Sequence, residues 1–437
     1  MSLNERVVPL RRLQMQNLYH LRWLRSSMLA SQMRHLSTLP APALAGLRVL
    51  ELASVLAGPS VGQFFAELGA DVIKVENRKT GGDVTRSWRL RGDDPSKPSS
   101  YFACCNLGKR SIALDAQTPK GQDLCRRLAA TSDVVLASYK PGDAEKLGMD
   151  AQRLRAKHPQ LIYAQITGYG LKDPRVGYDA VVQAESGFTF MNGSPGEAGR
   201  PTKMPVALVD LLAAHQLKEA VLLALLQRER TGEGAHVHVS LMAAALSSLA
   251  NQATGYLIAG QVPQRMGSDH PSICPYGTDF LDQDGLPIIL AVGSDAQFRS
   301  LCEVLKRSEL ADCPRFASNA ERVANRQELL SLLASAIAET KRDELLLELR
   351  RRKVPAGAIA DMATVFQSDQ AQAMVLPDGN SLGLRQVAWD GHQRKKLKTL
   401  PGFGEHSIEI LTEDLLLSKD EVQELVENGV VATHGTS

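Results

Sequence analysis

The chain has 437 residues, of which 44% are hydrophobic and 22% charged, values typical of a folded protein with more than one domain. The net charge of +2 does not indicate a nucleic-acid partner, and no apolar run is long enough for a transmembrane helix, so no membrane partner is expected. The six cysteines form no C-x-x-C pair and no cluster with histidines, which argues against a disulfide scaffold and gives no sign of a metal site.

Residues 1–40 have the composition of a mitochondrial transit peptide. They contain six Arg and several Ser but a single acid, Glu5, and no long apolar segment, which distinguishes them from a secretory signal. We therefore expect the protein in the mitochondrial matrix. Removing these residues would lower the net charge from +2 to about −3. The alternative is a basic arm that binds RNA or a membrane.

Strands and helices alternate after residue 41. A strand at 47–53, a helix at 61–69 and a strand at 71–76 form a strand–helix–strand unit, which places both strands parallel in one sheet. The alternation continues with strands at 110–115, 133–138 and 161–167. The predicted fold is therefore α/β, with a large domain built on a Rossmann-like, doubly wound parallel sheet.

The pattern changes in the second half of the chain. A long helix is predicted at 205–230, a strand from His236 and a second helix at 242–258. From Tyr276 a strand pair and then helices indicate a smaller α+β domain. The expected division is residues 1–40 as transit peptide, 41–235 as the first part of the large domain, 236–275 as linker, 276–354 as small domain, and 355–437 as return to the large domain.

The familiar nucleotide-binding motifs are absent. The first strand–helix turn lacks G-x-G-x-x-G, and L-G-K-R-S at Leu107 is followed by a predicted strand instead of the helix that a P-loop requires. Neither NAD nor ATP is therefore expected.

One stretch, Val176 to Phe188, combines several chemical signals. Asp179 follows the predicted strand 161–167 and a glycine-containing loop, in the N-cap position of a short helix. A carboxylate there can accept hydrogen bonds from first-turn N–H groups, which favours its ionised form. Open α/β sheets also bind their ligands beyond the carboxyl ends of the strands. On the residues alone, the alternative is an Asp that only caps its helix.

The motif R-x-G-Y-D-x-x-x-Q-A-x-S-G around Asp179 resembles the signature of the family III coenzyme A transferases. Further similar stretches follow the family's order along the chain, from about residue 43 to 425: L-G-A-D-V-I-K-V-E, N-L-G-K-R-S-I-A-L-D, R-T-G-E-G and H-P-S-I-C-P-Y. The resemblance implies that Asp179 is the catalytic nucleophile. It also implies an interlocked homodimer and a glycine loop that covers the intermediate, although the corresponding residues 266–271 keep one glycine.

The activity implied by this resemblance is transfer of coenzyme A between acids. Asp179 would form first an aspartyl-acyl anhydride and then an aspartyl-CoA thioester. Coenzyme A thioesters would be substrates, and no cofactor would be bound permanently. Together with the leader, the resemblance implies succinyl-CoA as donor and glutarate or a related dicarboxylate as acceptor, with Arg86, Arg89 or His270 holding the far carboxylate. The alternatives are an α-methylacyl-CoA racemase-like enzyme and a non-catalytic protein that binds coenzyme A.

The resemblance also implies which residues contact coenzyme A. Phosphate groups favour Lys and Arg donors, and the first strand–helix turn would approach the pantetheine arm. Arg78 stands one position after Asn77, where formyl-CoA transferase-like sequences often carry Arg. The candidate cofactor-binding residues are Val55, Ala57, Arg78, Asn106, Lys109, Arg110, Lys140 and Met204.

Overall fold

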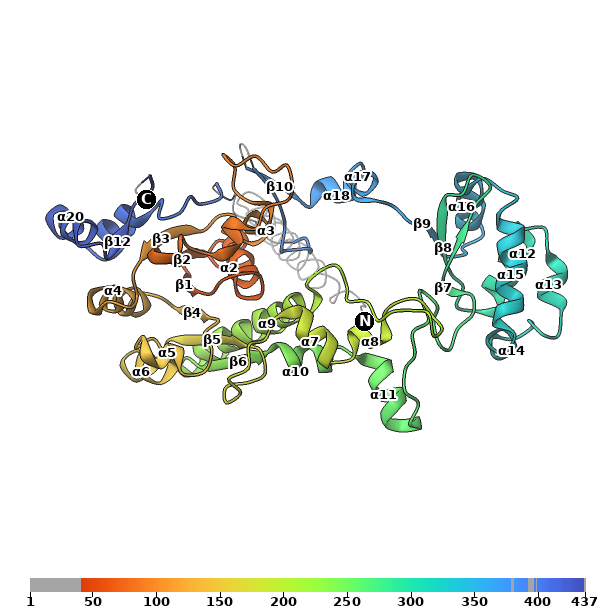
Figure 1. The fold of residues 1–437 in the computed structure, drawn as a ribbon, viewed down its shortest axis with the longest axis horizontal. Helices are drawn as coiled ribbons and strands as arrows, with labels where there is room; N and C mark the ends of the chain where they lie inside the picture. Colours follow the sequence, from red (N-terminus) through yellow and green to blue (C-terminus); the bar gives the residue numbers. More distant parts are fainter. Residues whose placement is uncertain (1–40, 379–380, 392–396, 398, 436–437) are drawn as a thin grey trace, which may run out of the picture.

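The structure is a computed structural model, and it describes residues 41–378, 381–391, 397 and 399–435; the predicted transit peptide lies outside these residues. A large part and a small part are visible in Figure 1. The large part contains a seven-stranded sheet in the order β12-β3-β2-β1-β4-β5-β6, parallel except where β12 meets β3. Its strands are β1 Arg48–Leu52, β2 Asp71–Asn77, β3 Arg110–Leu114, β4 Val134–Ala137, β5 Ile162–Thr167, β6 His236–Ser240 and β12 Val431–Ala432. The predicted α/β fold is confirmed.

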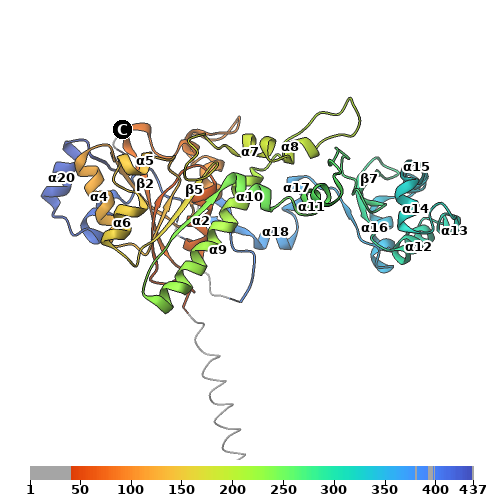
Figure 2. The ribbon, with the colours of Figure 1, turned by 90° about the horizontal axis from the view of Figure 1, so that it is seen from below.

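Helices cover both faces of this sheet (Figure 2). Neighbouring residues of β1 explain the arrangement, because Val49 packs into the core with α2 and α9, whereas Leu50 packs into the core with α4 and α6. Successive strand side chains point to opposite faces, so a strand that is apolar at both positions needs cover on both sides. The helices are α2 Ala57–Glu67 and α9 Leu208–Thr231 on one face, and α4 Pro119–Ala130, α6 Ala151–Lys157 and α20 Lys419–Glu427 on the other.

The small part has a core of its own. Its antiparallel sheet consists of β7 Tyr276–Leu281, β8 Pro287–Ala291 and β9 Ala356–Ala358, and apolar side chains from this sheet and the helices beside it form one buried cluster. Those helices are α12 Asp295–Val304, α13 Ser308–Asp312, α14 Asn319–Ala324, α15 Arg326–Ile337 and α16 Arg342–Arg351.

Two boundaries differ from the predicted division. β6 was placed in the linker that begins at residue 236, but it pairs with β5 and forms an edge of the large sheet. β9 lies beyond the predicted end of the small domain at 354 and pairs with β8. Both corrections have the same cause. The strand with which a short strand pairs decides the sheet to which it belongs, and the local sequence does not reveal that partner.

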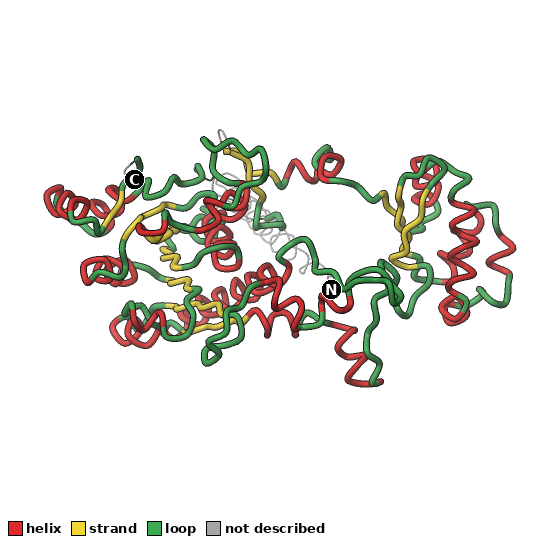
Figure 3. The backbone as a smooth tube through the Cα atoms, in the orientation of Figure 1, coloured by secondary structure: helices red, strands yellow, loops and turns green. Residues whose placement is uncertain are grey.

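Two connections, rich in loop, join the two parts (Figures 1 and 3). The first runs from α11 (Ala250–Ala259) to β7, and the second from β9 through α17 (Met362–Val365) and α18 (Asp369–Ala373) to the hairpin of β10 (Val375–Asp378) and β11 (Ser381–Leu384). The helix predicted at 242–258 is two helices, α10 (Leu241–Ser247) and α11, because the chain turns at Ala250, whose φ is 48°.

The remaining elements are short and lie mostly in the large part. No helix among the described residues is both long and apolar enough to cross a bilayer. The short elements are the helices α3 Ser100–Asn106, α5 Asp143–Lys146, α7 Asp179–Glu185, α8 Phe188–Met191 and α19 Ser407–Glu409, the 3-10 turns η1 Arg78–Thr80 and η2 Val84–Ser87, and the π turn η3 Ile410–Asp414.

Candidate active site

A hollow of about 250 Å³ lies at the carboxyl ends of β1, β4 and β5. This is the edge at which open parallel sheets bind their ligands. The turns after the three strands supply most of the lining, and the start of α9 adds Asp210. The lining residues are Ser54 to Gly58, Ser138 to Pro141, Ile166 to Gly168, Arg175 to Asp179, Asp210 and Leu241.

Asp179 is held from two directions in this hollow. Its Oδ1 accepts a hydrogen bond from the main-chain N–H of Val209 over 2.8 Å, and its Oδ2 accepts one from Nε2 of Gln183 over 2.7 Å. The predicted N-cap role is wrong, because Tyr178 occupies that position and Asp179 is the first residue of α7. The carboxylate therefore interacts with the N-terminus of α9 instead of capping its own helix.

Sequence analysis did not single out Gln183. This side chain is fully buried, and its Oε1 accepts the main-chain N–H of Met204 over 2.8 Å. One amide group thus connects Asp179 with the chain segment that precedes α9. The available signal was the spacing, since residues four apart on a helix lie side by side.

The loop that delivers Asp179 depends on two glycines. A Cβ on Gly177 would lie 2.2 Å from the Cα of Gly168, and a Cβ on Gly168 would lie 2.5 Å from the Cα of Gly177. The two ends of the loop therefore touch backbone to backbone, an approach that any other residue prevents. This contact brings Asp179 back to the end of β5.

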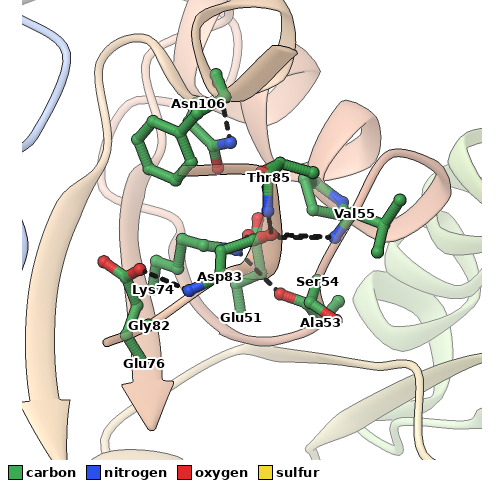
Figure 4. A network of polar contacts seen from close by, with 12 residues as sticks. Glu51, Ala53, Ser54, Val55, Lys74, Glu76, Gly82, Asp83, Thr85 and Asn106 are labelled. Carbon is green, nitrogen blue, oxygen red and sulfur yellow. Dashed lines mark hydrogen bonds and ion pairs between the residues drawn. The ribbon is translucent and has the colours of Figure 1, made fainter. Parts of the chain in front are cut away.

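Buried charges fix the turn that forms the opposite wall (Figure 4). Val55 has a φ of 72°, and its N–H faces both carboxylate oxygens of Asp83 at 3.3 and 3.2 Å. Asp83 pairs with Lys74 over 3.0 Å, and Lys74 also donates to Glu51 over 2.9 Å. Burial favours the neutral form of Asp83, but the charge of Lys74 outweighs this effect and lowers the pKa of Asp83.

Four of the predicted site residues meet at the hollow: Asp179, Val55, Ala57 and Lys140. Ala57 is buried, whereas Lys140 is exposed at the loop after β4. Met204 lies close to them, because its N–H is bonded to Gln183. These residues come from segments far apart in the sequence, so only the sheet topology brings them together.

The other predicted cofactor residues lie elsewhere in the structure. Lys109 is buried and its Nζ binds Glu51 over 2.7 Å and Oδ1 of Asn106 over 2.8 Å, so neither Lys109 nor Asn106 lines the hollow. Arg110 begins β3 at the amino edge of the sheet and pairs with Asp414 over 2.7 Å.

A second hollow of about 360 Å³ adjoins the first and shares Ser54, Ser138 and Tyr139 with it. Asn77 and Thr80 are among its lining residues. Arg78 lies between these two residues in the chain, with its guanidinium beside Gly429. The two hollows together follow the carboxyl edge of the sheet, and this elongated shape suits a long ligand.

The cations predicted for the far carboxylate of an acceptor do not line the hollow. Arg86 forms a forked pair with Glu76 at 2.8 and 2.7 Å, Arg89 donates to the carbonyl of Asp94, and Nδ1 of His270 accepts the N–H of Ser272. The hollow instead contains Arg175, whose side chain pairs with Asp173 over 2.9 Å and with Glu185 over 3.4 Å. Arg175 stands in the R-x-G-Y-D motif, but the sequence analysis gave it no role.

The predicted covering loop also lies apart from the hollow's lining. Within residues 266–271, the N–H of Gly267 donates to the carbonyl of Gly193 over 3.1 Å, and Gly267 has a φ of 64°. This contact joins the loop to the segment that follows α8.

Comparison with known proteins gives consistent matches over most of the chain. CoA-transferase family III matches residues 44–406. Succinate--glutarate CoA-transferase of Agrobacterium fabrum is 39% identical over 387 residues, which cover 85% of this chain and 96% of that protein. Human succinyl-CoA:glutarate CoA-transferase is 33% identical over 410 residues, covering 90% and 91%. The crystal structure of a CAIB/BAIF family protein from Brucella suis superposes with a TM-score of 0.77 at 40% identity and covers 86% of this chain and 100% of that chain.

Proposed function

The chain belongs to CoA-transferase family III and is a CoA-transferase, and from this premise we propose that it moves coenzyme A from succinyl-CoA to glutarate or a related dicarboxylate. Asp179 is the proposed nucleophile. This role is supported by one observation: Val209 and Gln183 hold the carboxylate of Asp179 by hydrogen bonds in a hollow at the carboxyl edge of the sheet. The names of two relatives, one bacterial and one human, support the choice of acids.

The reaction proceeds through the carboxylate of Asp179. One of its oxygens attacks the thioester carbonyl of succinyl-CoA, the C–S bond breaks, and an aspartyl-succinyl anhydride and the thiolate of coenzyme A result. The thiolate attacks the aspartyl carbonyl and releases succinate, which leaves an aspartyl-CoA thioester. The acceptor carboxylate repeats these steps in reverse order. Each step exchanges one activated acyl group for another, so no ATP is consumed.

The two hollows provide the proposed binding site for coenzyme A. Val55, Ala57 and Met204 would contact the arm that carries the thioester, and Lys140 would bind a phosphate group. Arg78, which lies in the chain between two lining residues of the second hollow, is a further proposed phosphate ligand. Asn106 and Lys109 contribute indirectly, because they support the wall through Glu51.

Arg175 is the proposed partner of the acceptor's far carboxylate. Its side chain is exposed on the hollow and is planar, as required for a forked contact with a carboxylate. A bound dicarboxylate would take the place of Glu185, which is the more distant of its two acidic partners.

We further propose a homodimer located in the mitochondrial matrix. A second copy would cover the apolar side chains of the two connections, where Leu257, Ile258 and Met362 are 77%, 86% and 71% exposed. An arginine-rich segment at residues 1–40 supports the location. Light scattering of the purified protein and N-terminal sequencing of the protein recovered from mitochondria test these two points.

Trapping the activated carboxyl group tests the function. The protein is incubated with succinyl-CoA and hydroxylamine, which converts an activated aspartyl group into a hydroxamate, and is then digested with trypsin. Asp179 and Asp210 fall in different peptides, residues 176–203 and 204–218. We expect the mass change of the hydroxamate at Asp179. In a separate incubation without hydroxylamine, addition of glutarate should yield glutaryl-CoA.

The outcomes separate the parts of the proposal. A label on Asp210, or glutaryl-CoA formed by an Asp179→Asn variant, would show that the nucleophile is another group. A label on Asp179 with no transfer to glutarate would leave the nucleophile in place and disprove the acceptor.

A further inference from the structure

A second carboxyl group, Asp210, lines the same hollow as Asp179. It stands in the first turn of α9, directly after Val209, whose N–H holds Asp179. The carboxyl group of Asp210 makes no hydrogen bond and no ion pair with another described residue. The reaction described above gives it no task, although it lies beside the reacting group.

The surroundings of Asp210 disfavour a second negative charge. Asp179 faces it from α7 and Tyr101 from α3, while the two cations of the hollow are Lys140, at the loop after β4, and Arg175, which Asp173 and Glu185 neutralise. Burial and, second, the charge of Asp179 raise the pKa of Asp210 to about 7. A substantial share of the molecules therefore carries a protonated Asp210 at neutral pH.

We propose that protonated Asp210 donates a hydrogen bond to the acyl oxygen of the substrate beside Asp179. This inference rests on the proposed transferase function. The O–H would stabilise the negative charge that develops on this oxygen when Asp179 attacks, as a neutral acid can do in a pocket that water does not fill. No covalent bond to Asp210 is made or broken, and its proton stays on the carboxyl group.

Ionised Asp210 would have the opposite effect. Its charge would repel the carboxylate of Asp179, the oxyanion and a dicarboxylate substrate at once. Since a raised pKa means that the carboxyl is neutral below about pH 7 and charged above it, the rate of transfer should decrease as the pH rises through this range.

The test compares the pH dependence of kcat for the wild type, Asp210→Asn and Asp210→Ala between pH 5.5 and 8.5. The wild-type rate should fall on the alkaline side of about pH 7. Asn keeps an N–H donor but cannot ionise, so Asp210→Asn should be about tenfold slower at low pH and should lack the alkaline decrease. Asp210→Ala has no donor and cannot ionise, so it should be about 100-fold slower than the wild type at low pH and should also lack the alkaline decrease.

Two results would overturn the inference while leaving the transferase function intact: an unchanged alkaline decrease in Asp210→Asn, or wild-type kcat in Asp210→Ala. Thermal melting of both variants identifies a loss of rate that comes from unfolding. In that case the pH profile of Asp210→Asn decides the question, because the pH at which kcat decreases does not depend on the amount of folded enzyme. If the wild type transfers no coenzyme A at any pH, the proposed function fails and this inference fails with it.

Discussion

The main-chain N–H of Val209 donates a 2.8 Å hydrogen bond to Oδ1 of Asp179. Val209 is the second residue of α9, a helix of 24 residues, so the carboxylate faces the positive end of a long helix. Asp179 is also the first residue of α7. The proposed nucleophile is therefore positioned by two helices, one that carries it and one that binds it.

Replacing Gln183 with Ala should reduce transfer without abolishing it. The variant loses the 2.7 Å hydrogen bond to Oδ2 of Asp179 and the bond from Met204, so the carboxylate can rotate out of line for attack. A hydrogen bond to a charged group contributes about 1.5–3 kcal/mol, which corresponds to a decrease of roughly 10- to 100-fold in kcat. The KM for succinyl-CoA should change little. Steady-state kinetics at fixed glutarate measures both values.

Gln63→Ala is the matched control for this prediction. Gln63 is equally buried and binds the N–H of Leu107 and the carbonyl of Leu384, away from the hollow. Its loss should lower the melting temperature and leave kcat close to that of the wild type. If both glutamine variants lost the same activity, the effect of Gln183 would be one of stability alone.

Gly177→Ala should inactivate the enzyme while most of the fold survives. The new Cβ would lie 2.2 Å from the Cα of Gly168, so the two ends of the loop must separate and Asp179 must move. We expect kcat/KM to fall by at least about 100-fold, since small displacements of reacting groups have effects of this size. Circular dichroism should remain close to the wild type. Gly357→Ala in β9 is the control, because its Cβ would meet only Ile289 at 4.0 Å.

Lys140→Ala should weaken binding of the thioester. Lys140 is exposed at the hollow, and losing one cation that binds a phosphate should raise the KM for succinyl-CoA by about tenfold. The effect should diminish at high salt, because screening already weakens this contact in the wild type. Lys146→Ala removes an exposed lysine that pairs with Asp143 on α5 and should leave the KM unchanged. If the two variants had the same KM for succinyl-CoA, Lys140 would not be part of the binding site.

The sheet and the position of Asp179 could be predicted from the sequence because both depend on local pattern. Alternating strands and helices define a parallel sheet, and the residues after β5 must lie at its carboxyl edge. The hydrogen bond from Val209 to Asp179 could not be predicted, because Val209 is 30 residues away and nothing local links it to the carboxylate.

The same limit applies to the basic residues. Lys109 and Lys140 were equivalent candidates in the sequence, yet Lys109 reaches Glu51, which is 58 residues earlier in the chain. Arg110 begins β3 and therefore points to acids at the amino edge. Whether a lysine is buried in an ion pair or free to bind phosphate depends on which acids the fold places beside it, and local sequence does not contain that information.

Lys74→Met should destabilise the large part of the protein in a pH-dependent way. Lys74 is buried and pairs with both Glu51 and Asp83. Its removal leaves the buried carboxylate of Asp83 without its ion-pair partner, whereas Glu51 keeps its pair with Lys109. The free energy of unfolding should therefore fall by about 3–5 kcal/mol at pH 7. Lys146→Met is the control, since Lys146 forms an exposed pair with Asp143 and its loss should cost at most about 1 kcal/mol.

The pH dependence identifies the cause of this loss. Burial alone would raise the pKa of Asp83 and of Glu76, but nearby positive charge lowers both values. Lys74 has the largest lowering effect on Asp83, and Arg86 has the largest on Glu76. A lowered pKa contributes stability that is present above the pKa of the unfolded chain, about 4, and is lost as the pH falls through the folded value. The difference between Lys74→Met and the wild type should therefore shrink as the pH is lowered from 7 to 4 and below. Urea unfolding followed by fluorescence of Trp88 and Trp389, both in the large part, measures this difference. A deficit that stays constant with pH would mean that Lys74 stabilises the protein by packing and not by its charge.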